Sequence, residues 1–312
     1  MHRDKDEFVP AYLHLLSSGE LANRVSAASR HLEDCDLCPR YCRVNRRLSV
    51  KAAVCRTGER AVVHSYGAHH GEEDPLRGWR GSGTIFFSWC NLRCVYCQNW
   101  EISQKGIGEE VGPERLAAIM IELQEQRCHN INLVSPSHVV AQILAAVELA
   151  ARRGLRLPLV YNTGGYDSLE ALQLLDGVVD IYMPDMKYGD SQTARKYSKV
   201  RDYVAFNRAA VTEMHRQVGD LVLDTGGVAR RGLLVRHLVL PNKLSGTEQV
   251  LAFIANALST HTYLNLMDQY YPCYRAGDYA PLRRPLEPAE YQAALQLAEH
   301  YGLYRLDRRV PV

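Results

Sequence analysis

The sequence has no long hydrophobic run. Its longest apolar runs fall far short of the roughly 18 residues that a membrane span needs. Its net charge is only +2, from 37 basic and 35 acidic residues, so charge gives no reason to expect a membrane or nucleic-acid partner. No internal repeat or low-complexity tract is present. With 46% hydrophobic and 23% charged residues, the 312-residue chain has globular composition, which excludes a disordered chain, a collagen and a coiled coil.

A signal peptide is also missing, because the first residues, MHRDKDEFVPAYLHLL, carry too many charges and interruptions to form one. We therefore expect a cytoplasmic protein, in which thiols stay reduced. Cysteine is abundant by contrast, with nine residues, seven of them from Cys35 to Cys97. In a reducing compartment, clustered cysteines indicate metal binding or catalysis more than disulfides. We interpret Cys128 and Cys273, which stand apart, as inert thiols.

The chain divides into two parts. Residues 1–80 form a Cys-rich segment with weak periodicity and many turn formers, whereas residues 81–312 alternate short apolar runs with amphipathic stretches. In the second part we predict strands at residues 84–88, 130–134, 157–161, 179–183, 233–240 and 262–267. Helices are predicted at residues 113–127, 138–153, 169–176, 192–218, 246–258 and 287–301, with Ser168 as an N-cap.

Strands that alternate with helices predict a mainly parallel sheet. A full eight-stranded barrel needs about 250 residues for the barrel alone, so six units predict an α/β fold with an open or partial (β/α)6 barrel. Active-site residues in such folds lie at the carboxyl ends of the strands. The residues after each predicted strand are therefore the candidates for function.

Three cysteines follow the first predicted strand. Cys90, Cys94 and Cys97 are separated by three and then by two residues. In a straight helix the first and last would stand about 10 Å apart along the axis, so a loop suits a compact cluster better. Three thiolates are typical of an iron–sulfur cluster that leaves one iron free for another ligand. The alternative is a zinc half-site completed by a distant residue.

The Cys90-x3-Cys94-x2-Cys97 spacing, with Tyr96 before the last cysteine, resembles the signature loop of the radical S-adenosylmethionine (SAM) superfamily. The wider string at residues 81–103 resembles a subgroup related to pyruvate formate-lyase activating enzyme. The loop follows the first predicted strand of the barrel, which is the context that this family requires.

The resemblance covers nearly the whole chain and implies a mechanism. The three cysteines would hold a [4Fe-4S] cluster whose open iron binds SAM. Reductive cleavage of SAM gives methionine and a 5′-deoxyadenosyl radical, which abstracts a hydrogen atom from a substrate. The implied enzyme is an oxidoreductase like the glycyl-radical activases, with a reduced flavodoxin- or ferredoxin-type electron donor and a protein or peptide substrate. One departure from the family pattern is Trp89, where a small residue, often glycine, is expected.

The resemblance also suggests which residues bind SAM. Tyr96 lies in the cysteine loop, and Ser135 and Ser137 follow the second strand, where activating enzymes commonly carry Gly-Gly-Glu-Pro. Hydroxyl or backbone oxygens of the two serines could accept hydrogen bonds from the SAM amino group. The alternative for Ser137 is that it caps the helix that begins near His138.

Three further candidates follow the next two strands. Asn162 would contact the ribose or carboxylate of SAM, unless its segment is only a tight turn. Asp185 and Lys187 look like the Asp-x-Lys element of activating enzymes. The two side chains point to the same side of an extended segment, so they are expected to hold SAM or a cation. The alternative is a surface ion pair. No catalytic residue is assigned.

A second set of cysteines, Cys35, Cys38, Cys42 and Cys55, lies within 21 residues. This density predicts a second metal site, for which zinc and an iron–sulfur cluster remain equal choices. The alternative is four reduced structural thiols. A polar run at residues 64–73 is predicted to be a surface loop. Two rival functions remain, a zinc-binding protein that interacts with nucleic acid and a pure iron–sulfur electron carrier.

Overall fold

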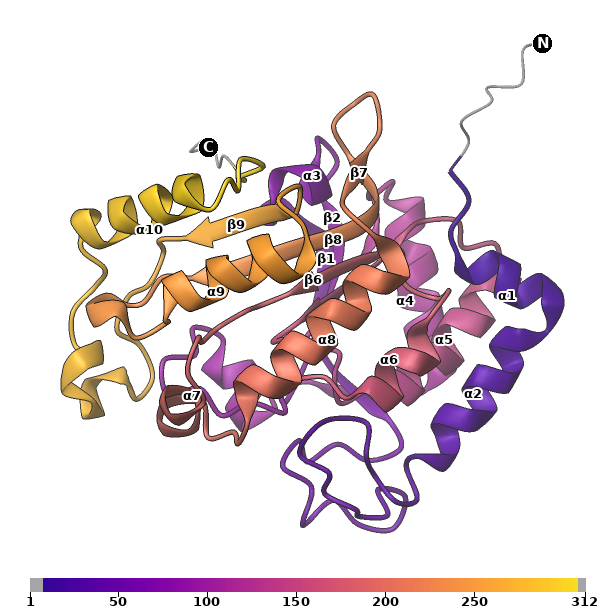
Figure 1. The fold of residues 1–312 in the computed structure, drawn as a ribbon. Coiled ribbons are helices and arrows are strands. Elements are labelled where there is room, and N and C mark those ends of the chain that lie inside the picture. The colour runs from indigo at the N-terminus through magenta and orange to yellow at the C-terminus, as the bar shows by residue number, and fades with distance from the viewer. Residues whose placement is uncertain (1–7, 308–312) are drawn as a thin grey trace.

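A nine-stranded sheet forms the centre of the protein, whose computed structural model describes residues 8–307 (Figure 1). Six neighbouring strands run parallel: β2 (Ser82–Phe87), β4 (Ile131–Val134), β5 (Leu159–Thr163), β6 (Ile181–Pro184), β8 (Ala229–Leu238) and β9 (Tyr263–Met267). Three strands are antiparallel to their neighbours: β1 (Ala61–His69), β3 (Glu109–Val111) and β7 (Val222–Leu223). Among the described strands β3 pairs only with β1 and β9 only with β8, so the sheet is not closed. The predicted partial (β/α)6 barrel is confirmed.

All six predicted strands are present, with ends that differ from the prediction by at most four residues. They formed the clearest signal because each is a short apolar run between helical stretches. In β4, Ile131 and Leu133 pack into the large core cluster that also contains Leu144 and Val147 of a neighbouring helix. Complete burial of such a side chain stabilises the fold by about 1.5–3 kcal/mol.

Helices cover the outer face of the sheet (Figure 1). The six that follow the barrel strands are α4 (Pro113–Glu125), α5 (Val140–Arg152), α6 (Leu169–Leu175), α8 (Tyr203–Val218), α9 (Thr247–Phe253) and α10 (Pro288–His300). The predicted cap is confirmed, because the Ser168 side chain accepts a hydrogen bond from the backbone N–H of Ala171 at the start of α6. Short helical turns occur at Glu101–Lys105, Pro241–Lys243, Ile254–Leu258, Ala276–Asp278 and Ala280–Leu282.

Three helix predictions need correction. The single helix expected at residues 192–218 is two helices, α7 (Ser191–Ser198) and α8, because Lys199 and Asp202 adopt left-handed backbone angles with φ of 56° and 50°. The helix expected at residues 246–258 ends its α-helical part at Phe253 and continues as a π-helical turn. Ser137 does not cap the following helix, since α5 begins at Val140 with Val139 as its N-cap.

The N-terminal part contains structure that its weak periodicity did not indicate. Helices α1 (Tyr12–Ser18) and α2 (Glu20–Arg30) pack against α5, and α2 also contacts α6. Strand β1 pairs with β2 of the barrel, and the short helix α3 (Asp74–Arg77) lies between these two strands in the chain. The stretch from Cys35 to Cys55 is an irregular loop at the lower end of Figure 1.

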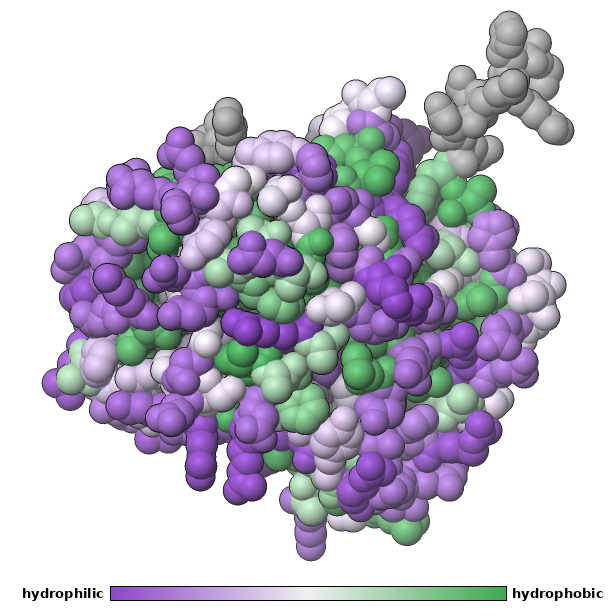
Figure 2. Space-filling view, viewed as in Figure 1, coloured by the Kyte–Doolittle hydropathy of each residue, from purple (hydrophilic) through white to green (hydrophobic). Residues whose placement is uncertain are grey.

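Hydrophilic and hydrophobic residues are interspersed on the molecular face that Figure 2 shows. Within residues 8–307, no helix combines the length and the apolar character that crossing a membrane requires.

Candidate active site

A cavity of about 400 Å³ opens at the carboxyl ends of the parallel strands. The loop after β2 contributes all three cysteines of the signature spacing to its wall, Cys90, Cys94 and Cys97. The remaining wall includes residues at the carboxyl ends of β4, β5 and β6, as strand topology predicts for an α/β sheet. Residues of β8 and β9, and residues at the end of β1 and just after it, complete the wall. The cavity is therefore the candidate active site.

Each of the three sulfur atoms has a hydrogen-bonding neighbour. The Cys94 sulfur lies 2.9 Å from the Ser198 hydroxyl, and the Cys97 sulfur lies 3.1 Å from the Ser103 hydroxyl. The backbone N–H of Leu92 donates to the Cys90 sulfur over 3.3 Å. These contacts would stabilise thiolates, which are the form of cysteine that binds metal.

Burial acts in the opposite direction on the free thiols. It raises the pKa of Cys90 to about 12 and that of Cys94 to about 11, and it also raises the pKa of Cys97. The thiols therefore carry protons at neutral pH, and a metal must displace those protons when it binds. Three buried sulfurs on one cavity are a donor set that fits an iron–sulfur cluster.

A single metal ion fits this donor set less well. Within residues 8–307, no three Cys, His, Asp or Glu side chains are grouped closely enough to hold one ion. The alternative of a zinc half-site at the cysteine loop therefore gains no support from the geometry. A cavity of about 400 Å³ beside the sulfurs leaves room for a larger group.

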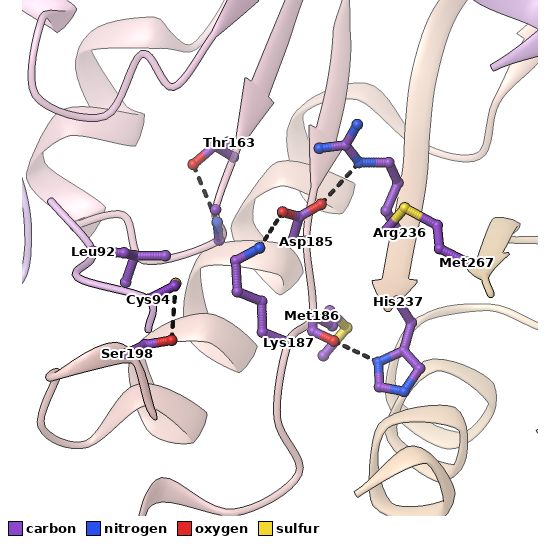
Figure 3. Close-up of polar contacts among 12 residues, drawn as sticks. Leu92, Cys94, Thr163, Asp185, Met186, Lys187, Ser198, Arg236, His237 and Met267 are labelled. Carbon is purple, nitrogen blue, oxygen red and sulfur yellow. Dashed lines mark hydrogen bonds and ion pairs between the residues drawn. The ribbon is translucent and has the colours of Figure 1, made fainter. Parts of the chain in front are cut away.

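A carboxylate between two cations occupies the opposite wall (Figure 3). One oxygen of Asp185 lies 2.5 Å from the Lys187 ammonium, and the other accepts a hydrogen bond of 2.8 Å from Arg236. Arg236 also donates to the side-chain oxygen of Asn162 over 2.7 Å. The side chains of Asp185 and Lys187 are 11% and 18% exposed, so the alternative of an ordinary surface ion pair is wrong.

The neighbouring charges in this group shift the pKa values of its members. Burial alone would raise the pKa of Asp185, but Arg236 and Lys187 outweigh it and hold that pKa below its usual value. Burial likewise opposes the charge of Lys187, yet Asp185 raises its pKa overall. Glu73 lies 3.7 Å from Arg236, but burial raises its pKa and so favours its neutral form. Glu72 and Glu73 both act on Arg236 in addition to Asp185. Lys187 and Arg236 are the cations on this wall that would attract an anionic group such as the SAM carboxylate.

The cavity brings together five of the six residues predicted to bind SAM. Tyr96, Ser135, Asn162, Asp185 and Lys187 line it.

Ser137 is not part of the cavity lining. It is 2% exposed, and its hydroxyl lies 2.9 Å from the hydroxyl of Thr163. Ser135 remains a candidate and adopts a left-handed backbone with φ of 61°.

The hydroxyl of Tyr96 is connected to the sulfur of Cys94 through two other hydroxyl groups. This hydroxyl lies 2.6 Å from that of Tyr188, which lies 2.7 Å from the Ser198 hydroxyl beside Cys94. The phenol of Tyr96 is therefore engaged with protein partners. This geometry favours a role in holding the loop over direct hydrogen bonding to SAM.

Some residues at or beside the cavity had no assigned role at the sequence level. Ser198 is 104 residues from Cys94, and no local pattern connects the two. The prediction of a surface loop at residues 64–73 is wrong in part, because Glu73 is fully buried and Glu72 lines the cavity. Glu72 pairs there with His69 over 3.1 Å. These residues lie beside the cavity because β1 pairs with β2, a contact that the sequence alone did not reveal.

All four N-terminal cysteines line a second, much smaller cavity of about 10 Å³. Cys35, Cys38 and Cys55 are buried and Cys42 is partly buried. The guanidinium of Arg46, which is 2% exposed, approaches the Cys35 sulfur at 3.7 Å. A buried cation beside four sulfurs would balance the negative charge of thiolates.

The family model of the radical SAM superfamily matches residues 84–222, a span that includes the cysteine loop and the Asp185 group. The chain belongs to the radical SAM superfamily. Members of this superfamily are enzymes, and membership implies a [4Fe-4S] cluster and SAM as cofactors. A pure electron carrier does not agree with this membership, because members of the superfamily are enzymes.

Two relatives from Methanocaldococcus jannaschii align with most of the chain. The one named Uncharacterized protein MJ0674 is 31% identical over 308 residues, which cover 96% of this chain and 84% of that protein. The one named Uncharacterized protein MJ0808 is 25% identical over 289 residues, which cover 85% and 78%.

The solved structures that resemble the chain are more distant. A radical SAM methyltransferase from Sphaerobacter thermophilus has 15% identity and a TM-score of 0.46, with 70% of this chain and 64% of that chain covered. Methylornithine synthase (PylB) has 14% identity and a TM-score of 0.47, with 96% and 75% covered.

Proposed function

We propose that this radical SAM enzyme cleaves SAM reductively and uses the 5′-deoxyadenosyl radical to abstract a hydrogen atom from a protein or peptide, as glycyl-radical activases do. One observation carries the SAM chemistry: Cys90, Cys94 and Cys97 share a cavity with the cationic group around Asp185. When bound, the cluster and SAM supply the electron transfer and the radical. The residues of the chain bind and orient these cofactors, and they exclude competing reactions.

Each wall of the cavity has a separate task in this proposal. Cys90, Cys94 and Cys97 hold the cluster through their sulfurs. Lys187 and Arg236 bind the SAM carboxylate by charge-assisted hydrogen bonds, and Asp185 fixes their positions. The location inside the barrel limits the access of water to a reactive radical.

The activase-like assignment rests on sequence resemblance. It is supported by the string at residues 81–103 and by the Asp185-x-Lys187 element at the end of β6. From the same resemblance we infer a reduced flavodoxin- or ferredoxin-type protein as electron donor. Both the protein or peptide substrate and a cytoplasmic location, where thiols remain reduced, belong to this proposal.

We also propose that Cys35, Cys38, Cys42 and Cys55 bind a second metal centre, either zinc or an iron–sulfur cluster. The support is their common cavity and the buried charge of Arg46 beside it. Arg46 also donates hydrogen bonds to the carbonyl oxygens of Thr57 and Gly58, which hold its guanidinium beside the cysteines.

The test of the SAM chemistry is anaerobic reconstitution with iron and sulfide, followed by addition of dithionite and SAM. We expect 5′-deoxyadenosine and methionine from the wild type, measured by liquid chromatography. Cys94→Ala should lose at least about 99% of this product, because three sulfurs are needed to hold the cluster. Cys128→Ala, which changes a buried cysteine far from the loop in sequence, is the control and should retain activity. A reduced, fully loaded wild type that leaves SAM intact would refute the proposal.

A further inference from the structure

Serine hydroxyls contact two of the three sulfur atoms that would hold the cluster. Ser198, the last residue of α7, lies 2.9 Å from the Cys94 sulfur (Figure 3), and Ser103 lies 3.1 Å from the Cys97 sulfur. A sulfur that binds iron is a thiolate and has no proton to give. The serine hydroxyl must therefore be the donor in both contacts once a cluster is bound.

The Ser198 hydroxyl belongs to a longer chain of hydroxyl groups. It lies 2.7 Å from the Tyr188 hydroxyl, which lies 2.6 Å from that of Tyr96. Each hydroxyl has a single proton. Because Ser198 gives its proton to the Cys94 sulfur, its oxygen accepts from Tyr188, and Tyr188 in turn accepts from Tyr96. All three O–H groups then point along the chain towards the same sulfur.

Protein surrounds this hydroxyl chain. The side chains of Ser198, Tyr188 and Tyr96 are all buried, so bulk water does not compete for their hydrogen bonds. Burial raises the pKa of Tyr188 well above its ordinary value, so this phenol keeps its proton and remains a donor. In such a low-dielectric setting, each hydrogen bond polarises the next one and strengthens it.

Backbone hydrogen bonds fix the distance between Ser198 and Cys94. The N–H groups on either side of Cys94, those of Arg93 and Val95, donate to the carbonyl oxygens of Ser198 and Tyr197 over 3.0 Å and 2.8 Å. The end of α7 and the cysteine loop are therefore held together at two points. The Ser198 hydroxyl is a donor with a preset position and needs no rearrangement to reach the sulfur.

The N-terminal loop holds the cysteine loop from another side. Arg40 donates from Nε to the carbonyl oxygen of Asn91 over 2.8 Å. The side-chain amide of Asn91, which is buried, donates to the carbonyl oxygen of Tyr166 over 2.7 Å. These contacts further limit the movement of the cysteine loop against its hydroxyl donors.

A second, shorter chain of donors reaches Cys97. The side-chain amide of Gln104 donates to the Ser103 hydroxyl oxygen over 3.1 Å, and the Gln104 side-chain oxygen accepts from Arg93 over 2.8 Å. The amide of Gln104 thus occupies the Ser103 oxygen as an acceptor and leaves the Ser103 proton for the sulfur. The same arrangement, a hydroxyl that accepts one hydrogen bond and donates another to sulfur, therefore occurs at two of the three cluster ligands.

We propose that these two chains raise the reduction potential of the cluster, with Ser198 and Ser103 as the direct donors and Tyr188 as a positioning residue that acts through Ser198. Reduction takes one electron from a one-electron reductant and adds one negative charge to the cluster and its thiolates, and no bond forms or breaks. Donors aimed at the sulfurs stabilise the added charge, so the reduced form gains more than the oxidised form. This inference rests on the cluster of the proposed function.

The test is an anaerobic redox titration of the reconstituted protein without SAM, with dithionite as the reductant. The electron paramagnetic resonance signal of the reduced cluster gives the midpoint potential. In Ser198→Ala we expect the equilibrium constant for reduction to fall about tenfold, which lowers the midpoint potential by about 59 mV for one electron. In Ser103→Ala we expect a fall of similar size, because each serine donates to one sulfur.

A pair of tyrosine variants separates the electrostatic effect from a structural one. In Tyr188→Phe the Ser198 hydroxyl still donates but is no longer polarised, so we expect a fall of about threefold, or about 28 mV. Tyr270→Phe is the matched control, because Tyr270 is also buried and packs against Tyr96, but its hydroxyl donates to the carbonyl oxygen of Leu282 over 2.7 Å. Each variant loses one buried hydrogen bond, and only Tyr188→Phe should shift the potential.

An unchanged potential in either serine variant, or equal shifts in Tyr188→Phe and Tyr270→Phe, would overturn the proposal. Iron and sulfide counts per chain show whether each variant is loaded. If Ser198→Ala binds no cluster, the comparison of the two tyrosine variants decides. The SAM chemistry is judged separately, because a wild type that binds the cluster and forms 5′-deoxyadenosine supports the proposed function whatever the potentials of the variants are.

Discussion

Lys187 combines two properties that oppose each other, a largely buried side chain and a positive charge. Its ammonium is stabilised by Asp185 at 2.5 Å, and Arg236 shares the same carboxylate. Lys187 and Arg236 both donate to Asp185, and they are the cations of this wall that could also bind an anionic group of a ligand. A glycine preserves this arrangement, since a Cβ on Gly165, at φ of 71°, would collide with the carbonyl oxygen of Asp185.

Removal of the Lys187 charge should weaken SAM binding. We expect Lys187→Met to raise the Kd for SAM about tenfold to a hundredfold, which corresponds to the loss of one charge-assisted hydrogen bond. Equilibrium dialysis with the reconstituted protein measures this. Lys243→Met, at an exposed lysine outside the cavity, is the control. An unchanged Kd in Lys187→Met would mean that the SAM carboxylate binds elsewhere.

Residues at this site differed in how well the sequence revealed them. Cys90, Cys94 and Cys97 were predictable because a local spacing encodes them, and Asp185 and Lys187 because they follow a recognisable strand. Ser198 depends on packing between segments 104 residues apart, for which a single sequence has no signal. Ser137 was predicted to contact SAM but does not line the cavity, because a residue near the end of a strand can face inward without reaching the cavity.

Elements with regular periodicity were predictable, and those defined by their partners were not. The parallel strands were found as apolar runs, whereas β1 mixes buried residues with exposed ones such as His64 and belongs to the sheet only through pairing with β2. The break between α7 and α8 was missed because left-handed residues other than glycine, here Lys199 and Asp202, leave a weak trace in sequence.

Three elements meet at His237 on β8. Its Nδ1 donates to the carbonyl oxygen of Met186 after β6 over 2.6 Å, and its Nε2 lies 3.0 Å from the hydroxyl of Thr247 in α9. Burial lowers the pKa of His237 to about 4. The imidazole is therefore neutral in the folded protein at physiological pH.

This histidine makes the packing of β8 sensitive to acid. Its unfolded pKa is about 6.5, so unfolding takes up a proton as the pH falls from about 6.5 to 4, and the free energy of unfolding decreases by about 2–3 kcal/mol over that window. In His237→Gln, whose amide can still donate to Met186, we expect a flatter pH dependence in denaturant titrations. His14→Gln, at an exposed histidine, is the control. Equal slopes for His237→Gln and the wild type would contradict this account.

At the scale of the whole molecule, ligands that bind only the folded chain must stabilise it. The cavity walls include the loop after β2 and residues in or just after β4, β5, β6, β8 and β9, so SAM would contact most of the barrel at once. SAM at 100 times its Kd should add about 2.7 kcal/mol to the free energy of unfolding. Anaerobic scanning fluorimetry of the reconstituted protein should show a Tm higher by several degrees.

The same measurement distinguishes specific from general effects of SAM. Lys187→Met, at the SAM concentration used for the wild type, should show a smaller rise in Tm because its Kd is higher. A rise of equal size in both proteins would mean that SAM stabilises the chain outside this cavity.

The attachment of the N-terminal loop to the cysteine loop has a consequence for biosynthesis. A ribosome makes Cys55 before it makes Cys90, and chains begin to fold from their earlier segments during translation. The N-terminal loop is therefore complete before residues 90–97 exist, and the hydrogen bond from Arg40 to the carbonyl oxygen of Asn91 can form only after the later loop has been made. A change that prevents the N-terminal loop from folding would thus remove a partner that synthesis normally supplies first.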